Sequence, residues 1–206
     1  MTASAVDAVV FDIGGVLVDW NPRHLYRQLF NGDDAAMEHF LATVCTQEWN
    51  AKNDRGRPLA EGVALLTAEH PNHAELIAAF VARWPETIAG AIEGTVKVLA
   101  ELKQYGIAVY ALSNWSAETF PLARPRFEFL SWFDGMVISG EEGVIKPEPR
   151  IFEILCERYD LRPGTTVFVD DIATNVDAAQ ALGFRAIQFL HPAQLRAALV
   201  DEGVLR

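Results

Sequence analysis

Four short clusters of polar residues fall at the ends of apolar, strand-like runs or in the loops after them. The clusters are Asp12-Ile13-Gly14-Gly15, Ser113-Asn114, Lys146-Pro147-Glu148-Pro149, and Asp170-Asp171 followed by Asn175. The two glycines after Asp12 allow a sharp turn that leaves the carboxylate at the end of a buried strand. Doubly wound sheets bind ligands at the carboxyl ends of their strands, where the strand order reverses, so we expect the four clusters to converge there.

The residue types in these clusters fit phosphoryl transfer through a covalent intermediate. A carboxylate such as Asp12 can attack phosphorus and form an aspartyl phosphate. Mg²⁺ usually takes one or two protein carboxylates, and Asp12 with Asp171 fits that role beside a backbone carbonyl. The Ser113 hydroxyl and the backbone N–H groups that follow, beginning with Asn114, can bind phosphate oxygens. Lys146 can balance the negative charge of the nucleophile and the phosphoryl group.

The adjacent acids Asp170 and Asp171 are the most informative of these clusters after the first. Two carboxylates that follow a buried strand repel each other unless a cation is bound, so the pair indicates a metal site. Taken singly, Lys146 also fits a solvated loop lysine, and Ser113-Asn114 also fits a turn. The order of all four clusters along the chain favours one site over four unrelated turns.

The elements that must position these residues alternate between strand-like and helix-like segments. Strands are predicted at residues 7–11, 107–112, 136–138, 166–170 and 185–189, and helices at 94–105, 149–158, 174–182 and 192–201. This alternation predicts an α/β fold, a doubly wound parallel sheet with helices on both faces. Gly106 and Gly183 stand where left-handed helix caps are expected.

A long insertion separates the first two predicted strands. About 95 residues lie between Asp12 and Ile107, far more than a simple crossover needs. Residues 22–85 read as helices, with breaks near Asn31-Gly32-Asp33, Gly56-Arg57-Pro58 and His70-Pro71-Asn72. We therefore predict an α/β catalytic core of residues 1–19 and 87–206 and an α-helical cap, residues 20–86, that covers the site.

The composition limits the classes of partner. Half of the 206 residues are hydrophobic, so the chain can bury a sizeable core, and no apolar stretch is long enough to cross a bilayer. A formal charge of −11, from 28 acidic against 17 basic residues, disfavours nucleic acid. No secretion signal is visible, and Cys45 and Cys156 are far apart, as expected for reduced thiols in a cytoplasmic protein. The expected partner is a small phosphorylated metabolite.

On these motifs the chain resembles the haloacid dehalogenase-like (HAD) hydrolase superfamily, from about residue 6 to residue 190. The motifs that carry the resemblance are Phe11-Asp12-Ile13-Gly14-Gly15-Val16-Leu17, Leu112-Ser113-Asn114, Lys146-Pro147-Glu148-Pro149-Arg150-Ile151-Phe152, and Val169-Asp170-Asp171 with Asn175. The resemblance implies a Rossmann-like core, a C1-type helical cap and an Mg²⁺-dependent phosphatase.

The resemblance also implies roles for the residues around the metal. Asp12 would be the nucleophile and an Mg²⁺ ligand, and the carbonyl of Gly14 would be a second ligand. Asp171 would be a third ligand. Asp170 and Asn175 would support the site.

One departure from the superfamily pattern concerns the general acid. The resemblance assigns Ser113 and Lys146 to the phosphoryl group, but the aspartate that phosphatases of this superfamily carry two residues after the nucleophile is Gly14 here. General acid catalysis contributes about 10²–10⁴-fold, so we expect reduced or selective activity that favours good leaving groups, such as sugar 1-phosphates and aryl phosphates. This Asp-x-Gly variant resembles the subgroup that contains bacterial α-glucose-1-phosphate phosphatase. Asp19 or a cap residue could replace the acid.

Substrate selection is expected in the cap, where polar and aromatic residues gather. Candidates that could face the cleft are Trp20, Asn21, Trp49, Asn50, Lys52, Asn53, Arg55 and, after the second cluster, Trp115. For each of them a purely structural role, at a helix end or in the core, is an equal alternative.

Two other functions are compatible with parts of this pattern. A 2-haloacid dehalogenase also uses an aspartate nucleophile without an acid two residues on, but it needs no metal, and the Asp170-Asp171 pair argues against it. A non-catalytic binding protein would explain the missing acid at Gly14. It would not explain why Asp12, Ser113 and Lys146 are all present.

Overall fold

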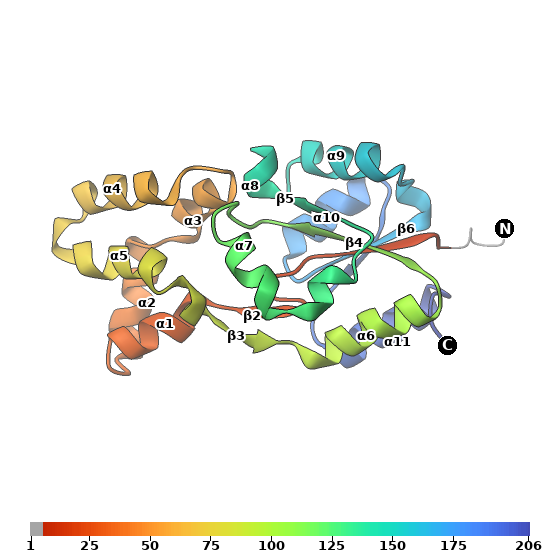
Figure 1. The fold of residues 1–206 in the computed structure, drawn as a ribbon, viewed down its shortest axis with the longest axis horizontal. Helices are drawn as coiled ribbons and strands as arrows, with labels where there is room; N and C mark the ends of the chain where they lie inside the picture. Colours follow the sequence, from red (N-terminus) through yellow and green to blue (C-terminus); the bar gives the residue numbers. More distant parts are fainter. Residues whose placement is uncertain (1–5) are drawn as a thin grey trace.

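The computed structural model describes residues 6–206 and contains a five-stranded parallel sheet. In chain order its strands are β1 (Ala8–Phe11), β4 (Ala108–Ser113), β5 (Gly135–Ile138), β6 (Thr166–Asp170) and β7 (Arg185–Gln188). Their spatial order is β5-β4-β1-β6-β7, with β1 at the centre (Figure 1). The chain adds β4 and β5 on one side of β1, then β6 and β7 on the other. The predicted doubly wound sheet is therefore confirmed.

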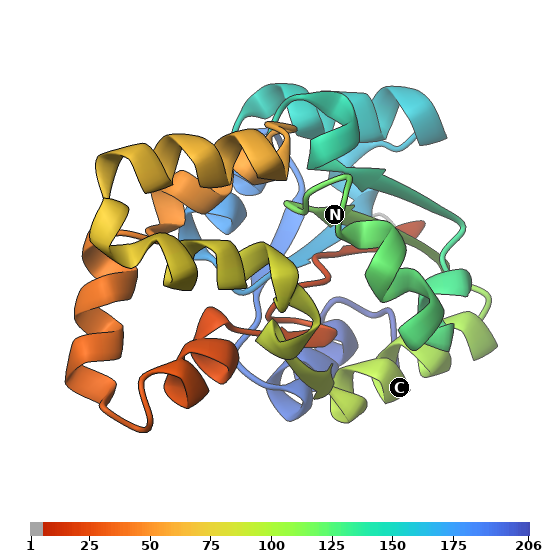
Figure 2. The same ribbon diagram turned by 60° about the vertical axis from the view of Figure 1, so that its left-hand side comes forward.

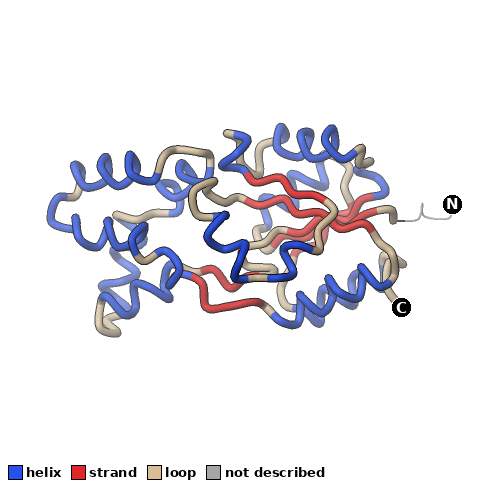
Figure 3. The backbone as a smooth tube through the Cα atoms, in the orientation of Figure 1, coloured by secondary structure: helices blue, strands red, loops and turns tan. Residues whose placement is uncertain are grey.

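Helices cover both faces of the sheet because successive strand residues point to opposite sides. Val9 and Phe11 belong to the core formed with α6 (Glu93–Gln104) and α11 (Pro192–Asp201). Val10 instead belongs to the core formed with α9 (Pro149–Tyr159) and α10 (Ala173–Ala181). Figure 3 shows helices on both sides of the strands. A strand buried on both faces is apolar along its length, so the strands of such a sheet can be predicted from short apolar runs in the sequence.

The predicted strands and core helices lie within one residue of the observed ones at each end. Gly106 and Gly183 follow α6 and α10 with φ values of +73° and +91°, as predicted for left-handed caps. Short α-helices that were not predicted, α7 (Phe120–Ala123) and α8 (Ser139–Glu142), follow β4 and β5.

The insertion after β1 leaves and re-enters the core through a small antiparallel pair of strands. The pair consists of β2 (Val18–Trp20) and β3 (Ile88–Ala91), and neither strand was predicted. Between them lie α1 (Pro22–Leu29), α2 (Asp34–Thr43), α3 (Gln47–Asp54), α4 (Leu59–Glu69) and α5 (Ala74–Ala82). Figures 1 and 2 show these helices as a group set apart from the sheet. The insertion is helical, as predicted.

The breaks between these helices fall near the predicted positions, and one further break was missed. It separates α2 from α3 and ends at Thr46, whose side chain accepts a hydrogen bond from the N–H of Trp49 and so caps α3. Boundaries at residues 19/20 and 86/87 stay a prediction, and residues 1–5 of the predicted core lie outside the described residues. Within residues 6–206, every helix is too short or too polar to cross a membrane. Cys45 and Cys156 are free thiols.

Candidate active site

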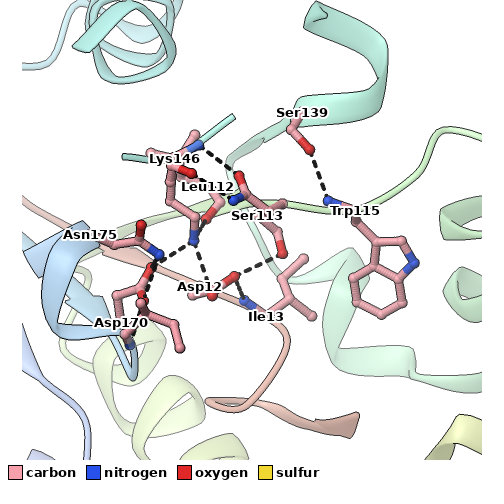
Figure 4. Close-up of polar contacts among 11 residues, drawn as sticks. Asp12, Ile13, Leu112, Ser113, Trp115, Ser139, Lys146, Asp170 and Asn175 are labelled. Carbon is pink, nitrogen blue, oxygen red and sulfur yellow. Dashed lines mark hydrogen bonds and ion pairs between the residues drawn. The ribbon is translucent and has the colours of Figure 1, made fainter. Parts of the chain in front are cut away.

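The parallel register of β1 with β4 and β6 brings three of the four clusters together. Phe11 pairs with both Ala111 and Val169, so the residues just beyond these positions meet at one edge of the sheet. The Asp12 carboxylate accepts a hydrogen bond from the Ser113 hydroxyl at 2.8 Å (Figure 4). It also accepts one from the backbone N–H of Ile13 at 2.6 Å.

Lys146 joins these clusters from the loop that precedes α9. Its Nζ lies 2.8 Å from the carbonyl oxygen of Leu112, 2.7 Å from Asp170 Oδ2 and 3.0 Å from Asp12 Oδ2. The three acceptors match the three N–H donors of an ammonium group. Burial alone would lower the pKa of Lys146, but the two carboxylates outweigh burial and raise it. Lys146 is therefore a buried, charged residue of the site and not a solvated loop lysine.

Asn114 holds the backbone of Lys146 in place. Its side-chain Nδ2 donates to the Lys146 carbonyl oxygen at 2.9 Å, and its Oδ1 accepts from the Lys146 N–H at 2.8 Å. The following Lys146–Pro147 peptide bond is cis. The side-chain amide of Asn114 is thus committed to the loop that carries Lys146, and the expected binding of substrate through its backbone N–H stays a prediction.

Asp170 supports the site from β6. Its Oδ1 accepts hydrogen bonds from the N–H of Ile172 at 2.8 Å and from Asn175 Nδ2 at 3.1 Å. Its Oδ2 accepts from Asn175 Nδ2 at 3.1 Å and from Lys146. Both oxygens are thus occupied by protein donors, and the carboxylate fixes Asn175 and Lys146.

Asp171 lies directly against the turn that follows Asp12. A Cβ atom added to Gly15 would overlap the Asp171 carboxylate, and Gly15 has a φ of +75°. Glycine at position 15 is therefore required twice, for the conformation and for the close approach of Asp171. A Cβ atom added to Gly14 would instead meet no atom within 4 Å.

The carboxylates at this edge form a candidate metal site. Asp12, Asp170 and Asp171 each offer an oxygen, and the three oxygens lie within 4.8 Å of one another. The single ammonium of Lys146 leaves two negative charges uncompensated when all three acids are ionised. Burial raises the pKa of Asp12, although Lys146 lowers it, and the other two acids raise it further. Burial and the neighbouring Asp170 also raise the pKa of Asp171.

This donor set fits a hard divalent cation such as Mg²⁺. All of its donors are oxygens, and the excess negative charge matches a divalent ion. Because Asp170 already accepts four hydrogen-bond contacts from protein groups, Asp12 and Asp171 are the carboxylates left to ligate. The backbone carbonyl of Gly14 could complete the protein ligands.

A cavity partly open to solvent lies between this edge and the inserted helices. Its lining residues come from the core, from α3 to α5 and from the segments that join them: Gly14, Trp20, Asn50, Asp54, Leu59, Phe80, Trp84, Asn114, Trp115, Ser116 and Thr119. The insertion therefore covers the site, as expected of a cap. Of the predicted substrate-selecting residues, Trp20, Asn50 and Trp115 line this cavity.

Three other predicted candidates have structural roles. Asn21 caps α1 by accepting a hydrogen bond from the N–H of Arg23. Trp49 and Asn53 are buried inside the insertion, where both contact the Arg57 side chain.

Two charged candidates also lie outside the cavity lining. Lys52 is exposed and lies 3.5 Å from Glu48. Arg55 forms an ion pair with Glu148. Asp19, considered as a replacement acid, is exposed and lies 3.1 Å from His24.

Asp54 lines the cavity and was missed in the sequence. Its Oδ2 accepts a hydrogen bond from Asn50 Nδ2 at 2.8 Å, and its carboxylate accepts another from the backbone N–H of Ser116. Burial raises the pKa of Asp54 to about 8, with a smaller contribution from Asp12. No spacing connects Asp54 to the motifs, and an acid in a polar helical segment usually faces solvent.

Comparison with known proteins shows similarity over most of the chain. Residues 6–183 match the haloacid dehalogenase-like hydrolase family. The sesquiterpene phosphatase astK of Aspergillus oryzae is 31% identical over 187 residues, which cover 85% of this chain and 86% of that protein.

Solved structures share the fold. A HAD family enzyme from Bacteroides thetaiotaomicron superposes with a TM-score of 0.72 at 21% identity, over 91% of this chain and 95% of that one. The same enzyme has been solved with magnesium and inorganic phosphate bound. The L-2-haloacid dehalogenase of Xanthobacter autotrophicus, with chloropropionic acid covalently bound, has a TM-score of 0.62 at 17% identity, over 98% and 85% of the two chains.

The motifs, the fold and these matches agree. With a family match that spans most of its length, and a relative that shares 31% identity over 85% of it, this chain belongs to the haloacid dehalogenase-like hydrolase family.

Proposed function

We propose that this chain is an Mg²⁺-dependent phosphomonoesterase that forms an aspartyl phosphate on Asp12. The observation that carries the proposal is the grouping of Asp12, Ser113, Lys146, Asp170 and Asp171 at one sheet edge, with two uncompensated negative charges when the acids are ionised. The magnesium and phosphate complexes of the Bacteroides enzyme support it. The sesquiterpene phosphatase activity in the name of astK supports it as well.

In this mechanism Asp12 attacks phosphorus while the alcohol leaves on the opposite side. Lys146 neutralises negative charge on Asp12 and on the phosphoryl oxygens. The ion pair with Asp170 keeps Lys146 protonated. Ser113 moves its hydroxyl bond from Asp12 to a phosphoryl oxygen. Bound by Asp12, Asp171 and the Gly14 carbonyl, Mg²⁺ would stabilise negative charge on the transferred group.

The dehalogenase alternative is less well supported, although the Xanthobacter enzyme shares the fold. A 2-haloacid carries a carboxylate, which needs a cationic or strongly hydrogen-bonding partner. Among the described residues that line the cavity, the one ionisable side chain is Asp54, an acid, and none is cationic. The excess negative charge of Asp12, Asp170 and Asp171 further disfavours an anionic substrate without a metal.

The lining of the cavity indicates the kind of alcohol that is released. Five large apolar side chains take part in this lining, Trp20, Leu59, Phe80, Trp84 and Trp115. We therefore propose an uncharged alcohol with a large apolar part, in agreement with the name of astK.

The polar groups of the lining are largely engaged with one another. Thr119 Oγ1 accepts from Trp115 Nε1 at 3.1 Å, Ser116 Oγ accepts from the N–H of Glu118 at 3.2 Å, and Asn50 donates to Asp54. These bonds use the Thr119 and Ser116 hydroxyls as acceptors, so each hydroxyl can still donate one hydrogen bond. A sugar 1-phosphate, suggested by the Asp-x-Gly variant, is the second candidate, because tryptophan rings also stack on sugars.

The organisation proposed for this activity is a catalytic core of residues 1–19 and 87–206 and a cap of residues 20–86. The core would supply the nucleophile and hold the metal and phosphoryl group. The cap would select the alcohol through its part of the cavity lining.

Hydrolysis of p-nitrophenyl phosphate, with and without Mg²⁺, tests the proposed reaction. We expect metal-dependent turnover in the wild type and none in Asp12→Asn, with a circular dichroism spectrum in the variant that shows it is folded. Metal-independent turnover, or turnover retained in Asp12→Asn, would contradict the mechanism. A folded protein that binds Mg²⁺ without turning over any phosphomonoester would indicate a non-catalytic binding role. Farnesyl phosphate and glucose 1-phosphate then distinguish the two substrate classes.

A further inference from the structure

The leaving alcohol needs a proton that Gly14 cannot supply. In the in-line displacement at Asp12, the leaving oxygen lies on the side of phosphorus away from Asp12 and toward the cavity under the cap. Gly14, on the core side, and Asp54, at the end of α3, both line this cavity. The space where a general acid is needed is thus bordered by a carboxyl group from another element.

We propose that Asp54 is the general acid and base of this site and takes the place of the acid that is absent at position 14. This inference rests on the proposed phosphomonoesterase function. It assigns a catalytic role to a residue of the helical insertion, so the insertion would take part in the reaction as well as in substrate selection.

The position of Asp54 is fixed by the core as well as by its own helix. Its carbonyl oxygen accepts a hydrogen bond from Ser139 Oγ at 2.6 Å, and the same Oγ accepts from the N–H of Trp115 at 2.9 Å. Ser139 and Trp115 appear together in Figure 4, at the edge of the site. The Arg55–Glu148 ion pair forms a second link between the insertion and the core. These contacts hold the backbone of Asp54 against the core, and its side chain is part of the cavity lining.

The hydrogen bonds of the Asp54 side chain leave a proton available for donation. Asn50 Nδ2 and the Ser116 N–H both donate to it, so the two bonds occupy acceptor positions and neither takes up the acid proton. Burial, with a smaller effect of the Asp12 charge, raises its pKa to about 8. A carboxyl group in this state is protonated at neutral pH, as a general acid must be.

The two chemical steps then balance with Asp54 as the proton carrier. In the first step Asp12 bonds to phosphorus, the P–O bond to the alcohol breaks, and the Asp54 proton passes to the leaving oxygen. In the second step water attacks phosphorus and gives its proton to the Asp54 carboxylate, while the bond from phosphorus to Asp12 breaks. Phosphate is released, and both aspartates return to their starting states.

Leaving groups of different basicity isolate this role. The p-nitrophenolate of p-nitrophenyl phosphate leaves without being protonated, whereas the alkoxide of benzyl phosphate needs a proton to leave. Both substrates carry one aromatic ring. In Asp54→Asn we expect benzyl phosphate turnover to fall by about 10²–10⁴-fold. With p-nitrophenyl phosphate the variant should still release a rapid burst of about one equivalent of p-nitrophenol, because the acid is not needed in the first step. Slow steady-state turnover should follow, because the base is missing in the second.

Matched variants show whether the loss is specific to Asp54. Asp19→Asn removes an exposed acid of β2 and should retain wild-type rates on both substrates. Gly14→Asp has room for its Cβ atom and, combined with Asp54→Asn, should restore benzyl phosphate turnover at least about tenfold. The Mg²⁺-induced rise in melting temperature should be the same in Asp54→Asn as in the wild type.

The outcomes separate this proposal from the proposed function. If the wild type turns over both phosphates and Asp54→Asn stays within about twofold of it on benzyl phosphate, Asp54 is not the acid. A double variant no faster than Asp54→Asn would also overturn the assignment. If the folded wild type shows no Mg²⁺-dependent release of p-nitrophenol from p-nitrophenyl phosphate, the phosphomonoesterase function itself is wrong.

Discussion

The side-chain amide of Asn114 holds the backbone of Lys146 from both sides. Nδ2 donates to the Lys146 carbonyl oxygen at 2.9 Å, and Oδ1 accepts from the Lys146 N–H at 2.8 Å. These bonds connect the residue after β4 to the loop before α9, 32 positions along the chain. The Lys146 ammonium can then reach Asp12 and Asp170 because its backbone is placed by Asn114.

We predict that Asn114→Ala lowers activity by releasing the Lys146 loop. The variant loses two hydrogen bonds to the backbone, which together contribute about 1–3 kcal/mol to the free energy of unfolding. The turnover number should fall more than the Michaelis constant rises, because the affected group stabilises the reacting phosphoryl charge. Steady-state kinetics and urea unfolding of the same preparation measure both effects. Asn114→Asp keeps the acceptor but sets a second carboxylate oxygen against the Lys146 carbonyl oxygen, so it should not recover the activity lost in the alanine variant.

Lys146→Met should destabilise the metal-free protein strongly. The fully buried ammonium is the partner of two buried carboxylates, and removal of one member of such a group costs about 3–5 kcal/mol. Combining it with Asp170→Asn removes one of the unpaired charges and should recover part of the loss. Urea unfolding without metal measures each variant. Equal stabilities of the single and double variants would show that charge burial is not the cause.

Gly15→Ala should disrupt the proposed metal site, whereas Gly14→Ala should not. A Cβ atom at Gly15 overlaps the Asp171 carboxylate, and its positive φ adds about 1–2 kcal/mol of strain for any other residue. At Gly14 the added atom meets nothing within 4 Å. The rise in melting temperature on adding Mg²⁺ is the measurement. We expect it to be lost in Gly15→Ala and kept in Gly14→Ala; a normal rise in both would exclude Asp171 as a ligand.

Stabilisation by Mg²⁺ should increase with pH. Burial raises the pKa of Asp12 from 3.8 to about 7, so the unfolded chain releases this proton at lower pH than the native protein does. The contribution of Asp12 to metal-free stability is therefore fully present below pH 3.8 and is lost as the pH rises to about 7. Mg²⁺ binds the ionised carboxylate and offsets this loss. Melting temperatures with and without Mg²⁺ should differ more at pH 8 than at pH 5.

Asp171→Asn is the control for this pH dependence. It removes one proposed ligand whose pKa is also raised, mainly by burial. The Mg²⁺-induced rise should be small in this variant at both pH values. A rise of the same size at pH 5 and pH 8 in the wild type would mean that the metal binds elsewhere.

The sequence by itself determined the α/β core and the motif residues of the site. Apolar runs such as Val9-Val10-Phe11 and Val167-Phe168-Val169 are continuous because their strands are buried on both faces. Gly106 and Gly183 marked helix ends because their positive φ values favour glycine. Asp12, Ser113 and Asp170 could be placed at one edge because parallel register carries strand ends together.

Only the tertiary structure decided how the insertion meets that edge. The strands β2 and β3 pair although they lie about 70 residues apart in the chain. With three and four residues, they are too short to show a periodicity in the sequence. The packing of the helices put Asp54 in the cavity while its neighbours Lys52 and Arg55 point elsewhere. The commitment of Asn114 to Lys146 depends on a contact between distant loops. Local propensity and spacing carry no information about such contacts, because they are set by which surfaces pack together in three dimensions.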